Sequence, residues 1–214
     1  MPSNFLASRV GASASYDRLE RLIHQRLEAG ADKAQIDAQI WDTFGEERAI
    51  LFTDLSGFSR HVAEFGIIHF LQTIFESERI LVPLIEQHGG ILLKVEGDSM
   101  LIIFRSIERA LQCAIDMQHA TFAYNHHRDD SEKVLLCAGL GFGNVLRIGD
   151  TDVFGSEVNA ASKLGEDIAK AGEILVTEAV RVAIEKGESH QVGFYKIDAV
   201  PSGAEMAYQV QYLK

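Results

Sequence analysis

Apolar and polar residues alternate along the first part of the chain with the spacing of helices. Residues 16–27 carry apolar side chains three or four positions apart, with charged residues between them. Asp32 is suited to cap a second helix, which Gly45 ends. The pattern predicts a short helical extension over residues 1–45, in which the small and polar residues 1–13 are poorly ordered.

The pattern changes at residue 48, where short apolar runs bounded by turns begin. Residues 49–53 form an apolar run that predicts a buried strand, and helical spacing extends over 59–88 with Gly66 dividing it. The later predicted elements are a hairpin of strands 91–95 and 100–104, a helix 106–124, strands 134–143 and 145–148, a helix 157–169, a strand 174–176, a helix 178–185, and closing strands 195–197 and 206–212.

This order predicts an α+β domain over residues 46–214, with a ferredoxin-like βαββαβ core and additional C-terminal strands and helices. Right-handed crossovers place the first core strand beside the third and antiparallel to it. Asp54, at the end of the first strand, then lies near Asp98, at the start of the third. Two carboxylates at one sheet edge are suited to hold a divalent cation for phosphate chemistry.

Three glycines alternate along the predicted strand 134–143, at Gly139, Gly141 and Gly143. They lack the following helix and the spacing of a dinucleotide-binding loop. A strand with glycine at every second position instead indicates that another backbone approaches it closely.

Composition limits the class of protein and its partners. The chain has 214 residues, 47% of them hydrophobic, and a formal net charge of −11. This predicts a globular protein for which nucleic acid and anionic membranes are unfavourable partners, although a metal ion can screen a bound nucleotide. Cys113 and Cys137 have apolar neighbours and are expected in the core. Without a signal sequence or membrane-length apolar run, we expect a cytoplasmic protein.

Three motifs then stand in order: Phe52-Thr-Asp-Leu-Ser-Gly-Phe58, Lys94-Val-Glu-Gly-Asp98, and Asp152-Val-Phe-Gly-Ser-Glu-Val-Asn-Ala-Ala-Ser162. Over residues 48–213 the chain resembles the class III nucleotidyl cyclases, the adenylate and guanylate cyclase catalytic domain. The resemblance implies the cyclase fold and an enzyme of intracellular signalling that forms a 3′,5′-cyclic nucleotide and pyrophosphate.

The resemblance also implies a metal and phosphate site. Asp54 and Asp98 match the two family aspartates that bind two Mg²⁺ or Mn²⁺ ions. The turn whose backbone groups help to hold phosphate oxygens consists of Leu55, Ser56, Gly57 and Phe58. The alternative for Asp98 is an ordinary hairpin-turn residue.

Lys94 and Asp152 match the base-reading pair of adenylate-specific members. Adenine offers an N1 acceptor and an N6 donor, so a lysine and an aspartate complement it, whereas guanine has the opposite pattern. A guanylate cyclase of the familiar type carries Glu in place of Lys94. Glu96 is expected on the same face of its strand, so the alternative is a simple ion pair between Lys94 and Glu96. ATP is therefore the expected substrate.

The cationic part of the site departs from the family pattern. Asn159 matches the ribose-orienting asparagine, but Lys163 stands where the family has a transition-state arginine. Lysine lacks the bidentate fork of arginine. The family also has a phosphate-binding lysine in the C-terminal hairpin, where residues 199–205 contain no basic residue.

Two alternatives to an adenylate cyclase therefore remain. One is a cyclase-homology module that binds nucleotide or partners without turnover, and the other is a cyclase for another base. The resemblance further implies a head-to-tail homodimer, in which one chain supplies the metal aspartates and the other supplies the base-reading and ribose residues.

Overall fold

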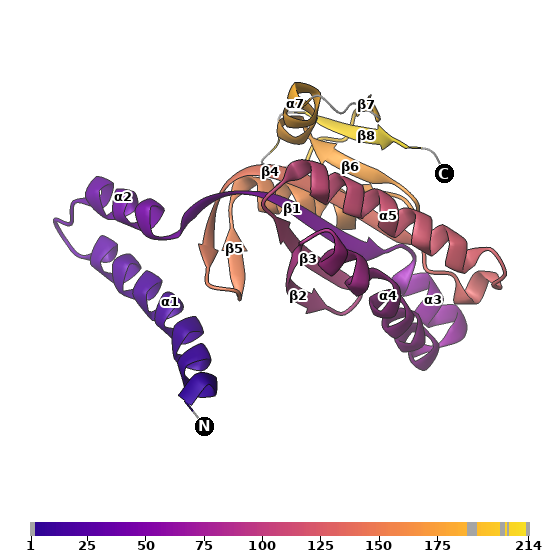
Figure 1. The fold of residues 1–214 in the computed structure, drawn as a ribbon, viewed down its shortest axis with the longest axis horizontal. Helices are drawn as coiled ribbons and strands as arrows, with labels where there is room; N and C mark the ends of the chain where they lie inside the picture. The colour runs from indigo at the N-terminus through magenta and orange to yellow at the C-terminus, as the bar shows by residue number, and fades with distance from the viewer. Residues whose placement is uncertain (1–2, 188–191, 202–203, 205, 213–214) are drawn as a thin grey trace.

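The computed structural model describes residues 3–187, 192–201, 204 and 206–212. Two helices extend from one end of a domain in which helices pack on a single sheet (Figure 1). The extension consists of α1 (Ser3–Leu27) and α2 (Lys33–Phe44). Asp32 caps α2 as expected, because its side chain accepts a hydrogen bond from the Gln35 amide. Helix α1 begins at Ser3 rather than near residue 16, so it is longer at its N-terminal end than the sequence pattern predicts.

The first half of the domain follows the predicted order. Its elements are β1 (Gly45–Leu55), α3 (Phe58–Phe65), α4 (Ile67–Gln87), β2 (Ile91–Glu96), β3 (Ser99–Phe104) and α5 (Ile107–Asn125). Gly66 divides α3 from α4 with a φ of 86°, a conformation that favours glycine. Ser106 caps α5 by accepting a hydrogen bond from the Arg109 amide. Strand β1 is longer than the predicted run because it continues its pairing with β4 back to Gly45.

The second half contains the main differences from the predicted elements. It consists of a 3-10 turn (Asp130–Glu132), β4 (Leu136–Ile148), β5 (Asp152–Phe154), α6 (Ser156–Lys163), a π-helical turn (Leu164–Ile168), β6 (Ile174–Thr177), α7 (Glu178–Lys186), β7 (Gly193–Ile197) and β8 (Ala207–Gln211). Strand β4 is continuous, whereas two strands were predicted. The sequence pattern also missed β5, which has only three residues.

The strand order is β2-β3-β1-β4-β6-β8-β7, with β5 paired to β4. Its first four strands have the ferredoxin-like order, and β1 pairs with β3 in antiparallel fashion as predicted. Thr53 lies opposite Met100 in this pairing. The end of β1, which carries Asp54, therefore lies beside the β2–β3 turn, which carries Asp98.

The main core lies between one face of the sheet and helices α4, α5 and α7. It includes Leu51 of β1, Phe70 of α4 and Met117 of α5, all at most 1% exposed. A smaller cluster on the other face joins the sheet to β5 and α6. Cys113 and Cys137 are buried and free, as expected.

The alternating glycines let α6 lie directly on β4. A Cβ added to Gly139 would stand 2.1 Å from the carbonyl oxygen of Ala161, and one added to Gly141 would stand 2.4 Å from that of Glu157. Both distances are too short for any side chain. The close backbone approach inferred from the sequence is confirmed, and it fixes α6 against the sheet.

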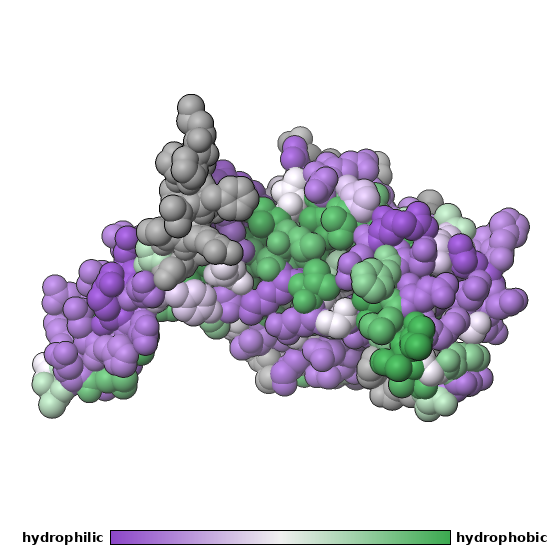
Figure 2. Space-filling model, turned by 90° about the horizontal axis from the view of Figure 1, so that it is seen from below, coloured by the Kyte–Doolittle hydropathy of each residue, from purple (hydrophilic) through white to green (hydrophobic). Residues whose placement is uncertain are grey.

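Apolar surface is unevenly distributed over the molecule. Hydrophobic residues gather near the middle and the right of the face in Figure 2, whereas the left end is mainly hydrophilic. Exposed apolar side chains of α4 include Ile68, Leu71 and Phe75. Within the described residues, none of the helices is both long enough and apolar enough to cross a bilayer.

Candidate active site

A cavity of about 450 Å³ opens where β1, the β2–β3 hairpin and the end of α6 meet. Its polar lining contains three of the predicted site residues, Asp54, Asp98 and Lys94. The other lining residues are Phe52, Glu96, Ser99, Leu101, Ser162 and Glu166. The fold therefore brings two acidic side chains from different strands to one cavity, beside a lysine.

Asp54 is held at the end of β1 by its neighbour on β3. The Ser99 hydroxyl donates a hydrogen bond of 2.8 Å to Asp54 Oδ1. The pKa of Asp54 is raised to about 6, chiefly by burial and to a smaller extent by the charges of Asp98 and Glu166. The hydrogen bonds from Ser99 and the Leu55 amide lower the pKa, but they do not offset these effects. Burial also raises the pKa of Asp98. Both carboxylates are thus less stable as anions than in water, and a cation would relieve that cost.

The donor chemistry of this pair fits Mg²⁺ or Mn²⁺. No group of three or more His, Cys, Asp or Glu side chains with metal-binding geometry occurs among the described residues. Mg²⁺ does not require such a cage, because it is commonly held by one or two carboxylates together with water and substrate phosphates. Asp54 and Asp98 are the residues that would hold the metal.

The turn after Asp54 offers fewer free amides than the sequence indicates. The Ser56 amide donates to the carbonyl oxygen of Leu135 at 2.8 Å, and the Leu55 amide bonds the Asp54 carboxylate. Gly57 has a φ of 91° and precedes α3, which begins at Phe58. The first amides of a helix have no acceptor within it. Gly57 and Phe58 are therefore the members of the turn placed to bind an anion.

Lys94 and Asp152 form an ion pair, with Lys94 Nζ 2.9 Å from Asp152 Oδ1. The hydrogen bond that Lys94 donates to Asp152 raises the pKa of Lys94, and Glu96 contributes only through its charge. Burial acts to raise the pKa of Asp152, but hydrogen bonds from Lys94, Tyr16 and the Val153 amide outweigh it, so the pKa lies below its ordinary value. The partner of Lys94 is thus Asp152 rather than Glu96.

Similarity to known proteins agrees with this arrangement. The family described as Adenylate and Guanylate cyclase catalytic domain matches residues 44–211. The chain belongs to this family. A crystal structure of an adenylate/guanylate cyclase/hydrolase from Silicibacter pomeroyi has the same fold, with 26% identity and a TM-score of 0.65 over 77% of this chain and 96% of that one.

Two curated relatives are similar to this chain over part of their own length. A putative adenylate cyclase 3 of Rhizobium meliloti (strain 1021) is 28% identical over 72% of this chain and 25% of its own length. The serine/threonine-protein kinase pkn2 of Myxococcus xanthus is 27% identical over 65% of this chain and 17% of its own length. The chain thus spans a quarter or less of these two relatives.

The remaining predicted residues of this cyclase domain lie outside the cavity. Asn159 and Lys163 are four positions apart on α6 and are both exposed, so they share one solvent-facing side of the helix. Lys163 forms no salt bridge within the part of the chain that the structure describes. In the C-terminal hairpin, residues 202, 203 and 205 lie outside the described residues.

Three polar cavity residues were not predicted from the sequence. Ser99 adjoins Asp98, which was the available signal. Ser162 lies on the last turn of α6, and Glu166 reaches the cavity on the π-helical turn, which shifts the helical register after Lys163. The charge of Glu166 contributes to the raised pKa of Asp54.

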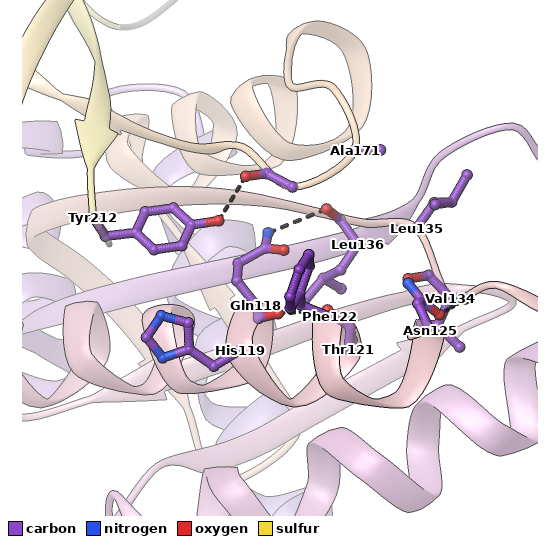
Figure 3. Close-up of a pocket in the computed structure, with 11 residues that line it drawn as sticks. Gln118, His119, Thr121, Phe122, Asn125, Val134, Leu135, Leu136, Ala171 and Tyr212 are labelled. Carbon is purple, nitrogen blue, oxygen red and sulfur yellow. Dashed lines mark hydrogen bonds between the residues drawn. The ribbon is translucent and has the colours of Figure 1, made fainter. Parts of the chain in front are cut away.

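A second cavity of about 200 Å³ lies beside α5 (Figure 3). Its principal polar groups already bond the chain itself. The Tyr212 hydroxyl donates to the carbonyl oxygen of Gly172, the Gln118 amide donates to that of Leu136, and Asn125 bonds the backbone of Val134. These bonds indicate a structural role for the polar side chains.

Proposed function

We propose that this domain is an adenylate cyclase, which converts ATP to 3′,5′-cyclic AMP and pyrophosphate. The observation that carries the proposal is the Lys94–Asp152 ion pair, which joins a donor and an acceptor of the kind that adenine requires. Asp54 and Asp98 line one cavity and are suited to metal–triphosphate binding, so a head-to-tail dimer can bring the base-reading pair of one chain to the carboxylates of the other. Membership of the cyclase family supports the reaction type.

The choice of adenine follows from hydrogen-bond polarity. Lys94 is a donor that suits adenine N1, and Asp152 is an acceptor that suits the N6 amino group. Guanine presents a donor at N1 and an acceptor at O6, so the same pair would leave these groups mismatched and desolvated. The relative from Rhizobium meliloti is named as a putative adenylate cyclase, which agrees with this choice.

Each proposed residue has a separate task in the reaction. Asp54 and Asp98 would hold two divalent ions, whose charge would neutralise the triphosphate and lower the pKa of the ribose 3′-hydroxyl. The amides of Gly57 and Phe58 bind phosphate oxygens at the start of α3. Asn159 orients the ribose, and Lys163 places a positive charge near the α-phosphate.

We propose that these residues meet in a head-to-tail homodimer. Asn159 and Lys163 are exposed on α6 and do not line the cavity of their own chain. A second chain is therefore needed to bring them to a nucleotide at Asp54 and Asp98. Such an arrangement gives two equivalent sites in each dimer.

Mixing two inactive variants tests the dimer. Asp54→Ala removes the metal side, and Lys94→Glu presents an acceptor to adenine N1. If each site takes Asp54 from one chain and Lys94 from the other, a mixed dimer has one intact site, so an equal mixture regains about a quarter of wild-type activity. No recovery after subunit exchange, verified by mass, would show that both residues act within one chain.

Loss of activity in Asp54→Ala alone tests the metal-dependent reaction. We expect cyclic AMP formation to become undetectable, while the exposed carboxylate variant Asp129→Asn keeps wild-type activity. Equal turnover by Asp54→Ala and wild type would exclude the proposed role of Asp54.

The second candidate function is a nucleotide-binding module without turnover. Two features favour it: Lys163 replaces the expected arginine, and residues 199–205 contain no basic residue. Losing one donor to the developing charge reduces rates by roughly 10²–10³-fold. ATP binding by calorimetry without any product over several hours would support this candidate, and product formation with many turnovers per chain would exclude it.

A further inference from the structure

The N-terminal extension contacts the proposed base-reading pair directly. Tyr16 of α1 donates its hydroxyl to Asp152 Oδ2 at 2.9 Å, across 136 positions of sequence. The same carboxylate accepts Lys94 Nζ and the Val153 amide at Oδ1, each at 2.9 Å. Each oxygen of Asp152 is therefore engaged by a different part of the molecule.

This contact rests on a packed interface. Leu22 of α1, Ile40 of α2 and Ile148 of β4 belong to one buried cluster, with exposures of 5%, 5% and 0%. A Cβ at Gly149 would lie 3.8 Å from the Ser15 hydroxyl, which places α1 against the β4–β5 turn. Helix α1 is thus positioned on the hairpin that carries Asp152.

The hydrogen bonds of Asp152 limit how its carboxylate can turn. A carboxylate offers about four acceptor positions, two on each oxygen. Both positions of Oδ1 are occupied by Lys94 and Val153, so a base amino group is left with Oδ2. Tyr16 occupies one position of Oδ2 and fixes the plane of the carboxylate, which leaves one directed acceptor.

We propose that Tyr16 is a positioning residue for base selection, through which α1 orients Asp152 toward the adenine amino group. This inference rests on the proposed adenylate cyclase activity. Without the phenol hydroxyl, Asp152 keeps its ion pair with Lys94 but loses the donor that fixes Oδ2. The ordering of Asp152 must then be achieved when the nucleotide binds, which weakens ATP binding more than the chemical step.

The test is Tyr16→Phe, which removes one oxygen and keeps the ring. We expect the KM for ATP to rise about tenfold, kcat to change less than twofold, and the ATP-to-GTP ratio of kcat/KM to fall about tenfold, as for loss of one hydrogen bond to a charged group. Tyr195→Phe is the matched control, since Tyr195 lies on β7 and is 63% exposed. It should leave all three values unchanged.

Dissociation constants for ATP and GTP, measured with each variant, distinguish a failure of the role of Tyr16 from a failure of the proposed function. An ATP preference in the wild type that survives in Tyr16→Phe overturns the role of Tyr16 alone. A rise in kcat at constant KM also overturns it, because that result would mean that the Tyr16 hydroxyl slows turnover and does not assist ATP binding. If the wild type shows no preference for ATP in binding or turnover, the proposed function fails and this inference fails with it.

Discussion

Lys94 of β2 and Asp152 of β5 form an ion pair although their strands are not neighbours in the sheet. Strand β5 pairs with the end of β4, and β2 lies at the edge beyond β3. The pair therefore joins two separate parts of the fold beside the acidic cavity. Its donor and acceptor are adjacent before any nucleotide binds, which is the preorganisation that base selection requires.

Reversing this pair should change the preferred base. In Lys94→Glu/Asp152→Asn, a carboxylate faces guanine N1–H and an amide donor faces O6, so we expect kcat/KM for ATP to fall roughly 10²-fold and that for GTP to rise. Initial rates with each nucleotide and Mn²⁺ measure the change. Glu96→Gln, in the same cavity, should retain the preference for ATP. A double variant that still prefers ATP would show that this pair does not select the base.

The pKa of about 6 for Asp54 predicts that metal binding weakens in mild acid. Protons compete with the cation for this carboxylate, so the apparent Mn²⁺ affinity at pH 5 should be roughly tenfold below that at pH 8. Calorimetric titration across this range measures the effect. Asp54→Asn should bind weakly at every pH, and a wild-type affinity that is independent of pH would contradict the assignment.

The same raised pKa has a consequence for stability without metal. Between the ordinary value of 3.8 and about 6, the folded carboxyl holds a proton that the unfolded chain releases. The contribution of Asp54 to the free energy of unfolding is therefore present at low pH and is lost as pH rises through this window. Urea unfolding should show this decline in the wild type relative to Asp54→Asn, and identical pH profiles would exclude it.

The sequence was sufficient to predict how β1 and β3 bring Asp54 and Asp98 together, because the order of elements and the handedness of crossovers determine that pairing. It was insufficient for Tyr16, because no local pattern links a helix residue to a strand 136 positions away. Glu166 was not predicted at the cavity because the π-helical turn interrupts the regular period of α6. Strand β5 was missed because three residues are too few to show alternation.

Lys163 should limit the rate of the reaction. Arginine at this position supplies a planar fork that binds phosphate oxygens in two places, whereas lysine supplies a point charge. We expect Lys163→Arg to raise kcat several-fold with little change in KM, and Lys163→Ala to lower kcat by roughly 10²-fold. Single-turnover rates measure the chemical step. Equal rates for all three proteins would show that Lys163 has no role in the chemical step.

Strand β4 should tolerate few substitutions at the glycines on which α6 packs. Gly139→Ala places a methyl group 2.1 Å from the Ala161 carbonyl oxygen, so backbone must move, and we expect a loss of about 3 kcal/mol in the free energy of unfolding. Gly143→Ala is the control, because its Cβ would meet a side-chain carbon of Glu157 at 3.2 Å and no backbone atom. Urea unfolding compares them, and equal stabilities would contradict the close packing.

ATP is the substrate that we propose for this cyclase domain. Purified protein is given ATP, GTP, CTP and UTP separately with Mn²⁺, and the products are identified by mass. We predict 3′,5′-cyclic AMP from ATP as the dominant product, with pyrophosphate in equal amount. A cyclic product formed mainly from another nucleotide, or none from any of the four, would contradict it.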